Sequence, residues 1–138
     1  MKTILLTGGA GFIGSHTALV LLELGFDVLV FDDFRNSSPF ALERVVEISC
    51  VKALSGKLTI IEGDITENSA ISAVFSTHAV DAVIHFAGLK SVAESVADPI
   101  GYYRVNLGGT LNLLSAMENA GVTKIVFSSS ATVYGSNL

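Results

Sequence analysis

Cysteine is almost absent from this sequence, because Cys50 is the only one among 138 residues. A single cysteine excludes a disulfide within the chain, and such sparse use is typical of proteins that work in a reducing compartment. We therefore expect a cytoplasmic protein in which Cys50 is buried and serves as a small hydrophobic residue.

Charge is also scarce, since only 15% of the residues are charged and the net charge is −5. The sequence contains no run of basic residues, so we expect no nucleic acid as a partner. Half of the residues are apolar, which excludes intrinsic disorder. The chain has the length of one domain with a sizeable core.

No apolar run reaches the roughly 20 residues that a membrane-spanning helix needs. The longest candidate, residues 18–31, is interrupted by Glu23, Gly25 and Asp27. The N-terminus lacks the charged and apolar regions of a signal peptide and leads directly into a strand pattern. We expect neither a membrane segment nor a secretion signal.

A glycine-rich stretch, residues 8–14, joins the apolar run 3–6 to a leucine-rich helical pattern. Gly8, Gly11 and Gly14 follow one another at intervals of three residues. In a strand-to-helix turn of this kind, the first glycine permits the tight turn, the second leaves space for a phosphate, and the third lets helix and strand pack closely. The N–H groups and the dipole of the helix then favour an anion. By itself, the spacing also fits a turn that binds nothing.

Asp32 favours the ligand-binding interpretation. It follows a second apolar run, residues 28–31, and lies 18 residues after Gly14. Dinucleotide-binding βαβ units place a carboxylate at about this offset, where it contacts the hydroxyls of the adenosine ribose. The two features together predict a dinucleotide site.

Strand and helix patterns alternate along the whole chain. Apolar runs predict strands at residues 3–6, 28–31, 58–61, 82–85 and 124–128. Helical patterns predict helices at residues 12–24, 39–54 and 66–76, a short one ending near 97, and a long one at 99–120. This alternation predicts an α/β fold with a doubly wound, Rossmann-type parallel sheet in the strand order 3-2-1-4-5.

Particular residues are expected to begin, end and anchor these helices. The candidate N-caps are Ser38 before Pro39, Thr66, and Asp98 before Pro99, and the candidate terminators are Gly25, Gly56 and Gly121. The residues expected to face the core are Phe40, Val45, Ile48 and Val51 in the second helix and Ile71, Val74 and Phe75 in the third. Charged residues of the second helix, Glu43, Arg44 and Glu47, are expected on its solvated face.

The candidate site lies at the carboxyl ends of the strands, where ligands of doubly wound sheets bind. The polar and glycine residues that follow the predicted strands occupy positions 8–14, 32–37, 64–65, 86–90 and 128–130. We expect these five segments to meet at one edge of the sheet.

Five motifs run through the chain. They are Thr-Gly-Gly-Ala-Gly-Phe-Ile-Gly-Ser-His at 7–16, Glu-Gly-Asp-Ile at 62–65, His-Phe-Ala-Gly-Leu-Lys at 85–90, Tyr-Tyr at 102–103 with Asn106 and Gly-Thr at 109–110, and Phe-Ser-Ser-Ser-Ala-Thr-Val-Tyr-Gly at 127–135. In this order and spacing they resemble the N-terminal part of the UDP-glucose 4-epimerases, a family of extended short-chain dehydrogenases/reductases. The first motif is shared across that superfamily, whereas the third and fifth are particular to the epimerases.

The resemblance implies that the cofactor is NAD and that residues 1–138 form part of its binding domain. The residues implied at the pyrophosphate are Gly8, Gly11, Phe12, Ile13 and Gly14. Asp32 is implied at the adenosine ribose, and the residues implied along the adenosine end are Asp33, Phe34, Arg35, Asn36 and Ser37. Asp64 and Ile65 are implied beside the adenine. The segment implied along the rest of the cofactor is Phe86, Ala87, Gly88, Leu89 and Lys90, with Asn106 holding both this loop and the cofactor.

The activity implied by the resemblance is interconversion of UDP-glucose and UDP-galactose, by NAD-mediated removal and return of hydride at C4. Ser130 is implied as the catalytic serine that binds the O4 hydroxyl of the UDP-hexose. Related 4,6-dehydratases have an Asp-Glu pair after the fifth strand, and Ala131 and Thr132 at these positions argue against that reaction. The substrate stays open between UDP-glucose and its N-acetylated counterpart. A homodimer or another form of self-association is also implied.

The sequence departs from the family at two places. Gly108 stands where the family has a second asparagine, with little expected effect on cofactor binding. The catalytic Tyr-x-x-x-Lys is not found, because the residue four positions after Tyr134 is Leu138. We therefore expect an N-terminal fragment that binds NAD but has little or no activity. The alternatives are a non-catalytic NAD-binding or sensing module and another NAD-dependent enzyme acting on nucleotide sugars.

The three histidines, His16, His78 and His85, share no spacing typical of metal ligands. We expect structural or surface roles for them and no metal site.

Overall fold

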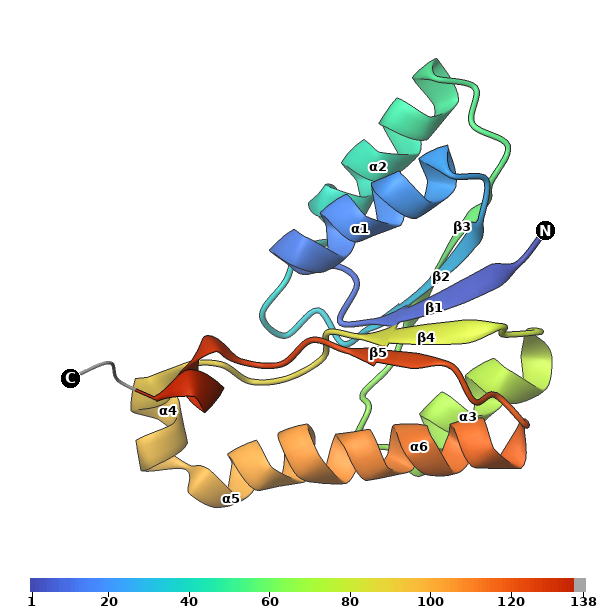
Figure 1. Ribbon diagram of the computed structural model, residues 1–138. Helices are drawn as coiled ribbons and strands as arrows, with labels where there is room; N and C mark the ends of the chain where they lie inside the picture. The colour runs from blue at the N-terminus through green and yellow to red at the C-terminus, as the bar shows by residue number, and fades with distance from the viewer. Residues whose placement is uncertain (136–138) are drawn as a thin grey trace.

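Five parallel strands form one sheet in the order β3-β2-β1-β4-β5 (Figure 1). The computed structural model describes residues 1–135, and only the backbone of residues 131 and 132. The strands are β1 (Thr3–Thr7), β2 (Asp27–Asp32), β3 (Leu58–Glu62), β4 (Ala82–His85) and β5 (Ile125–Phe127). The predicted strand order is confirmed, and each predicted strand end lies within one residue of its observed position.

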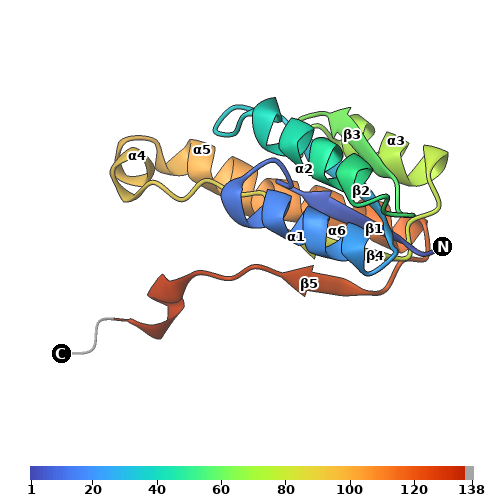
Figure 2. The same cartoon turned by 90° about the horizontal axis from the view of Figure 1, so that it is seen from above.

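Helices cover both faces of the sheet. Figures 1 and 2 show α1 (Phe12–Glu23) and α2 (Pro39–Val51) on one face, with α3 (Asn68–Thr77) and α6 (Thr110–Asn119) on the other. Successive side chains of a strand point to opposite faces. In β1, Leu5 therefore joins the core under α3 and α6, whereas Ile4 and Leu6 join the core under α1 and α2. Because both faces of the central strands β1 and β2 are buried, these strands are continuously apolar along their interior instead of alternating.

Helix α2 begins as predicted, since the Ser38 side chain accepts a hydrogen bond from the Phe40 N–H. Its inward face is narrower than predicted. Leu42 and Val45 are buried, but Phe40, Ile48 and Val51 are exposed. The prediction was wrong for these three because only the strip that faces α1 and the sheet is covered. Cys50 lies outside this strip and is exposed, so its predicted burial was wrong as well.

The end of α2 also differs from the prediction. The helix stops at Val51 because the Leu54 N–H returns to the Ser49 carbonyl at 3.0 Å and Ala53 takes a left-handed φ of 51°. Gly56 is not the terminator. A Cβ at Gly56 would lie 2.2 Å from the Phe26 carbonyl oxygen, so this glycine permits a close approach of two backbone segments.

Helix α3 begins one residue later than predicted, after Glu67 instead of Thr66. Thr66 does not cap it, since Glu67 is the N-cap residue. The Thr66 N–H and hydroxyl instead tie it to the preceding turn by donating to Asp64 Oδ1, at 2.8 and 2.7 Å. The predicted inward residues Ile71 and Val74 are buried, and Phe75 packs against them.

A long helical run follows the short predicted helix α4 (Val92–Ala97) and passes through three segments. They are α5 (Pro99–Tyr103), the π-helical segment η1 (Arg104–Gly109) and α6. Asp98 caps the run through a 2.9 Å hydrogen bond from the Gly101 N–H, and Gly121 ends it with φ +70°, both as predicted. The π-helical segment was not predicted, and none of these helices in the described part of the chain is long and apolar enough to cross a bilayer.

Strand β5 forms one edge of the sheet (Figure 2). It pairs with β4 through Ile125, Val126 and Phe127, and within residues 1–135 no strand pairs with its other side. Val126 and Phe127 are 61% and 60% exposed. A short 3₁₀ segment, η2 (Ala131–Tyr134), follows the strand.

Candidate functional site

A cavity of about 580 Å³ opens at the carboxyl ends of β1, β2 and β4. Four of the five predicted segments contribute to it. Its lining residues are Gly8, Gly11, Phe12, Ile13, Gly14, Phe31, Asp32, Asp33, Arg35, Asn36, Ser37, Gly63, Ile65, Phe86, Ala87, Gly88, Leu89, Lys90, Ser91, Glu94 and Val105. The topology therefore brings together residues from Gly8 to Val105, which are far apart in the sequence.

The glycine-rich turn forms one wall of the cavity and leaves no room for a side chain at Gly8 or Gly14. Gly8 has φ +68°, and a Cβ there would lie 2.6 Å from the Ala87 backbone nitrogen. A Cβ on Gly14 would lie 2.7 Å from the Gly8 carbonyl oxygen. Gly11 differs, because the nearest atom to a Cβ there would be the Gly8 oxygen at 3.4 Å, an ordinary contact. The chain itself therefore tolerates a side chain at Gly11, and what a side chain would reduce is the space in the cavity.

Helix α1 points its N-terminus at the same space. Gly11 is its N-cap residue, and no side chain among the described residues caps this end. Phe12 and Ile13, the first residues of the helix, line the cavity and are exposed. First-turn N–H groups and the helix dipole make such an end favourable for a phosphate or other anion.

Asp32 connects the glycine-rich turn to the loop after β2. Its side chain is buried, and its Oδ2 accepts a 2.9 Å hydrogen bond from the Ala10 N–H. Its Oδ1 accepts from the Phe34 N–H and the Ser37 hydroxyl, each at 2.9 Å. A carboxylate offers about four acceptor positions, so three are used by the chain and one remains for a ligand donor.

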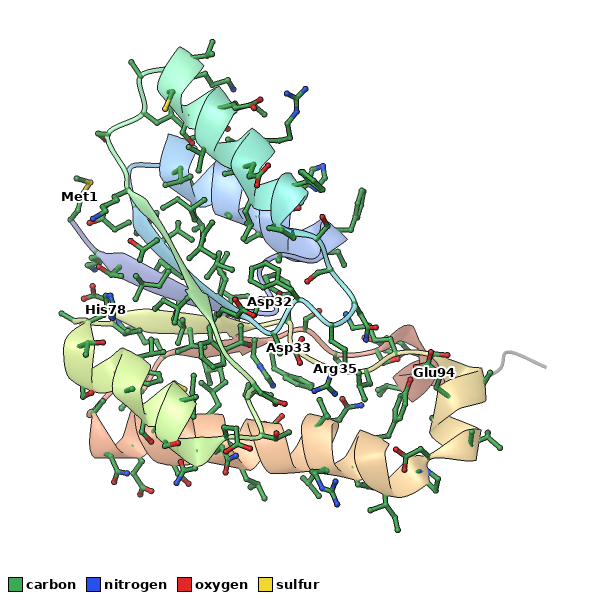
Figure 3. All side chains as sticks on the ribbon, turned by 180° about the vertical axis from the view of Figure 1, so that it is seen from behind. Met1, Asp32, Asp33, Arg35, His78 and Glu94 are labelled. Atoms are coloured by element: carbon green, nitrogen blue, oxygen red, sulfur yellow. The ribbon has the colours of Figure 1, made fainter. Side chains whose placement is uncertain are left out.

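Arg35 lies between two carboxylates at the rim of the cavity. Its Nη2 is 3.3 Å from Asp33 Oδ2 and 3.0 Å from Asp64 Oδ2. Burial raises the pKa of Asp64, but hydrogen bonds from Thr66 and the charge of Arg35 outweigh this effect and hold that pKa below its ordinary value. Figure 3 shows Asp32, Asp33 and Arg35 along the loop after β2, with Glu94 on α4.

The loop after β4, residues 86–90, lines the cavity and is held from the long helical run. Asn106, in the π-helical segment, accepts a 2.7 Å hydrogen bond from the Leu89 N–H and donates one of 3.0 Å to the Leu89 carbonyl. The oxygen and the nitrogen of the Asn106 amide therefore both bind the backbone of Leu89. Asn106 is not among the cavity-lining residues, so its implied contact with the cofactor stays a prediction.

His85 occupies the buried end of β4, directly before this loop, and is only 2% exposed. Its Nδ1 lies 2.5 Å from Thr7 Oγ1 and its Nε2 lies 2.9 Å from Thr110 Oγ1. Burial lowers its pKa to about 4, so the ring is neutral at pH 7. His85 therefore has a structural role, as predicted.

The other two histidines do not line the cavity. His16 packs beside Phe12 on α1, and His78 lies at the opposite end of the sheet from Asp32 (Figure 3). No group of residues within the described ranges could hold a metal ion.

Three residues of the implied cofactor set do not line the cavity: Phe34, Asp64 and Asn106. The Phe34 side chain packs against the core under α1 and α2. Ser130 follows the carboxyl end of β5 and is exposed. It does not line the cavity either.

Five lining residues were not anticipated, namely Phe31, Gly63, Ser91, Glu94 and Val105. Gly63 lies in the Glu-Gly-Asp-Ile motif, and a Cβ there would meet the Phe31 ring at 2.5 Å, so the motif could have indicated these two. Ser91 and Glu94 both bind the Tyr102 hydroxyl, through the Ser91 N–H and the Glu94 carboxylate, and no spacing in the sequence indicates this contact.

The family model for the NAD dependent epimerase/dehydratase family matches residues 4–138, nearly the whole chain. The chain belongs to this family. Curated relatives include UDP-glucose 4-epimerase 3 of Oryza sativa subsp. japonica, 57% identical over 133 residues, which cover 96% of this chain and 35% of the relative. The UDP-glucose 4-epimerase of Bacillus subtilis is 56% identical over 133 residues, which cover 96% of this chain and 38% of that relative.

Solved structures of the family superpose closely. UDP-glucose 4-epimerase from Bifidobacterium longum, in complex with NAD⁺ and UDP, has a TM-score of 0.86 at 51% identity and covers 97% of this chain. The enzyme from Stenotrophomonas maltophila, with bound NAD and formylated UDP-arabinopyranose, has a TM-score of 0.85 at 41% identity and covers 98%. The matched region is 38% and 39% of those chains. This chain thus spans little more than a third of the length of the family members it matches.

Proposed function

We propose that this chain binds NAD in the cavity at the carboxyl ends of β1, β2 and β4. The observation that carries the proposal is the placement of an uncapped helix N-terminus and a buried carboxylate on one cavity. The first suits a pyrophosphate, and the second, Asp32, retains an acceptor position for a ribose hydroxyl. Gly11 also suits a pyrophosphate, because it lines the cavity and has no side chain that would occupy this space.

We further propose that the whole protein interconverts UDP-glucose and UDP-galactose. Bound NAD would accept and return a hydride at C4 of the sugar. The residues of this chain would orient the cofactor through the glycine-rich turn, Asp32 and loop 86–90. Ser130, at the same edge of the sheet, would hydrogen-bond the O4 hydroxyl and help to position its proton. A hydroxyl is a poor base by itself, so the base that takes this proton would come from outside residues 1–138.

The site also fits a narrower function for the chain acting alone. None of its three tyrosines, Tyr102, Tyr103 and Tyr134, has a lysine four residues later. A chain that holds the cavity but lacks this base would bind NAD without appreciable turnover. This second candidate shares the cofactor proposal and differs from the first only in turnover.

The cofactor proposal is tested by titrating NAD into the chain in a calorimeter, with the variant Gly11→Ala. Its Cβ meets no backbone atom closer than 3.4 Å, so the fold should persist while the methyl group crowds the pyrophosphate. We expect binding at least about tenfold weaker, equivalent to about 1.4 kcal/mol. Gly108→Ala is the matched control, because a Cβ there has nothing closer than Tyr103 O at 4.0 Å. Unchanged affinity in Gly11→Ala, or no binding by the unaltered chain, would contradict the proposal.

A further inference from the structure

A chain of hydrogen bonds runs from the buried strand β1 to the loop that lines the cavity. Thr7 and His85 are neighbours across β1 and β4, and the imidazole bridges Thr7 to Thr110 at the start of α6. Thr110 Oγ1 in turn donates to the carbonyl oxygen of Asn106 at 2.6 Å. Asn106 is the residue whose amide grips Leu89.

For a neutral His85 ring, the hydrogen bonds of this chain fix the tautomer. The Thr110 hydroxyl has one hydrogen, and it points to the Asn106 carbonyl. Thr110 Oγ1 must therefore accept from His85, which places the ring hydrogen on Nε2. Nδ1 is then bare and accepts from the Thr7 hydroxyl, which is fully buried. Each nitrogen of the imidazole thus has a hydrogen-bond partner.

A neutral histidine suits this position because it offers one donor and one acceptor on opposite sides of a rigid ring. The low pKa that burial imposes on His85 keeps the ring in this form at neutral pH. Packing alone does not require it, since neighbouring strand residues such as Leu5 and Val83 are apolar and fully covered. Polar groups in such surroundings are costly unless their partners are all present.

The network ends where the cavity begins. Phe86 to Lys90 all line the cavity, and Asn106 holds this loop through both atoms of its amide. Asn106 itself lies in the π-helical segment, whose widened turn ends at Gly109, next to Thr110. The Thr110 hydroxyl bonds the Asn106 backbone and so ties this turn to the sheet.

We propose that the hydrogen-bonded pair His85 and Thr110 positions the loop 86–90. Thr110, bound to the His85 ring on one side, fixes the π-helical turn so that the Asn106 amide meets the Leu89 backbone, and this contact sets the shape of the loop along the cavity. The inference rests on the proposed function for its purpose, whereas the contacts that it invokes are made by residues of the chain alone.

The test removes the link at Thr110 in the full chain. Thr110→Val keeps the shape of the side chain and removes the hydroxyl, whereas Thr110→Ser restores it. Thr77→Val is the matched control, because Thr77 Oγ1 makes the same kind of bond to a carbonyl four residues back, to Ala73 at 2.7 Å, on α3. Hydrogen exchange of the Leu89 amide, followed by NMR without NAD, reports the grip of Asn106 directly.

We expect exchange at Leu89 to be roughly five- to tenfold faster in Thr110→Val, as the loss of about one hydrogen bond implies. Strand amides of β1 and β2 should keep their protection, Thr110→Ser should behave as the unaltered chain, and Thr77→Val should leave Leu89 unchanged. Affinity for NAD should fall by a similar factor in Thr110→Val.

Unchanged exchange at Leu89 in a folded Thr110→Val variant would overturn the proposal. So would an equal loss of protection at Leu89 and throughout β1 and β4, because the network would then support the sheet as a whole. If the valine variant does not fold, Thr110→Ala is read by the same criteria. An unaltered chain that binds no NAD would count against the proposed function, while the exchange at Leu89 would still decide this inference.

Discussion

The Asp32 carboxylate accepts a hydrogen bond from the Ala10 N–H at 2.9 Å, across 22 residues of sequence. One side chain at the end of β2 thus fixes the glycine-rich turn that follows β1. The same carboxylate holds the loop after β2 through Phe34 and Ser37. Asp32 therefore shapes two walls of the cavity before any ligand arrives.

Asp32→Asn should destabilise the fold. Asparagine has one acceptor oxygen, so its NH₂ group must face at least one of the donors of Ala10, Phe34 and Ser37. Leaving a buried donor without a partner costs about 1–3 kcal/mol, which urea denaturation would measure. Asp33→Asn is the control, since its oxygen can keep the exposed bond from the Arg35 N–H. Equal stability of the Asp32→Asn variant and the unaltered chain would contradict this role.

NAD should bind more tightly than NADP. The 2′-phosphate of NADP would lie near Asp32, and like charges about 4 Å apart repel by roughly 4 kcal/mol at an effective dielectric of 20. Arg35 is the cation that could receive this phosphate, but Asp33 and Asp64 already pair with it. Calorimetric titration of the whole protein with both cofactors measures the preference. Equal or tighter binding of NADP would show that Arg35 leaves its partners for the phosphate.

Ser130→Ala should lower kcat of the whole protein more than it weakens binding of the UDP-sugar. The hydrogen bond to O4 matters most while the proton is being transferred, so its loss raises the barrier more than it lowers affinity. Steady-state kinetics with UDP-galactose, alongside Ser129→Ala as a neighbouring control, would measure both constants. An unchanged kcat would remove Ser130 from the mechanism.

Stability should fall as the pH is lowered from about 6.5 to 4. The pKa of His85 is lowered from 6.5 to about 4 by burial, so the folded state holds the ring neutral while the unfolded chain gains a proton. The stabilisation is complete above the unfolded pKa and is lost as pH falls through the folded value, at up to about 1.4 kcal/mol per pH unit. Asp64, whose pKa is also lowered, loses its contribution only below about its ordinary 3.8. Urea denaturation across this range should show a smaller slope in His85→Gln, and an identical slope would assign the effect to another group.

The chain should associate with itself through β5, the long helical run, or both. Strand β5 leaves one side unpaired within residues 1–135, and such edges favour pairing with a second chain. Tyr103, Leu107, Leu111 and Leu114 are exposed along the helical run. Apolar helix faces of this kind favour symmetric dimers. Light scattering over a range of concentrations tests this, and a strict monomer at high micromolar concentration would refute it.

Much of the fold was predictable because it depends on local patterns. Short apolar runs separated by helical periods specify strands and helices, and the right-handed crossover rule then leaves few possible strand orders. The glycine spacing and Asp32 indicated the site, because a phosphate and a ribose impose their own requirements on the backbone. The sequence alone therefore determined the fold class, the strand order, the edge of the sheet that carries the cavity, and the family resemblance.

Only the tertiary structure decided which residues are covered and what they bind. Phe40, Ile48 and Val51 are as apolar as Leu42 and Val45, yet they stay exposed because no element within residues 1–135 packs over their side of α2. Thr66 could cap a helix by its chemistry, but its N–H and hydroxyl bind Asp64 and the helix begins after Glu67. His85, Thr110, Asn106 and Leu89 form a continuous network although nothing in their spacing connects them. Packing and long-range hydrogen bonds depend on which elements become neighbours in space, and a local sequence pattern does not specify those neighbours.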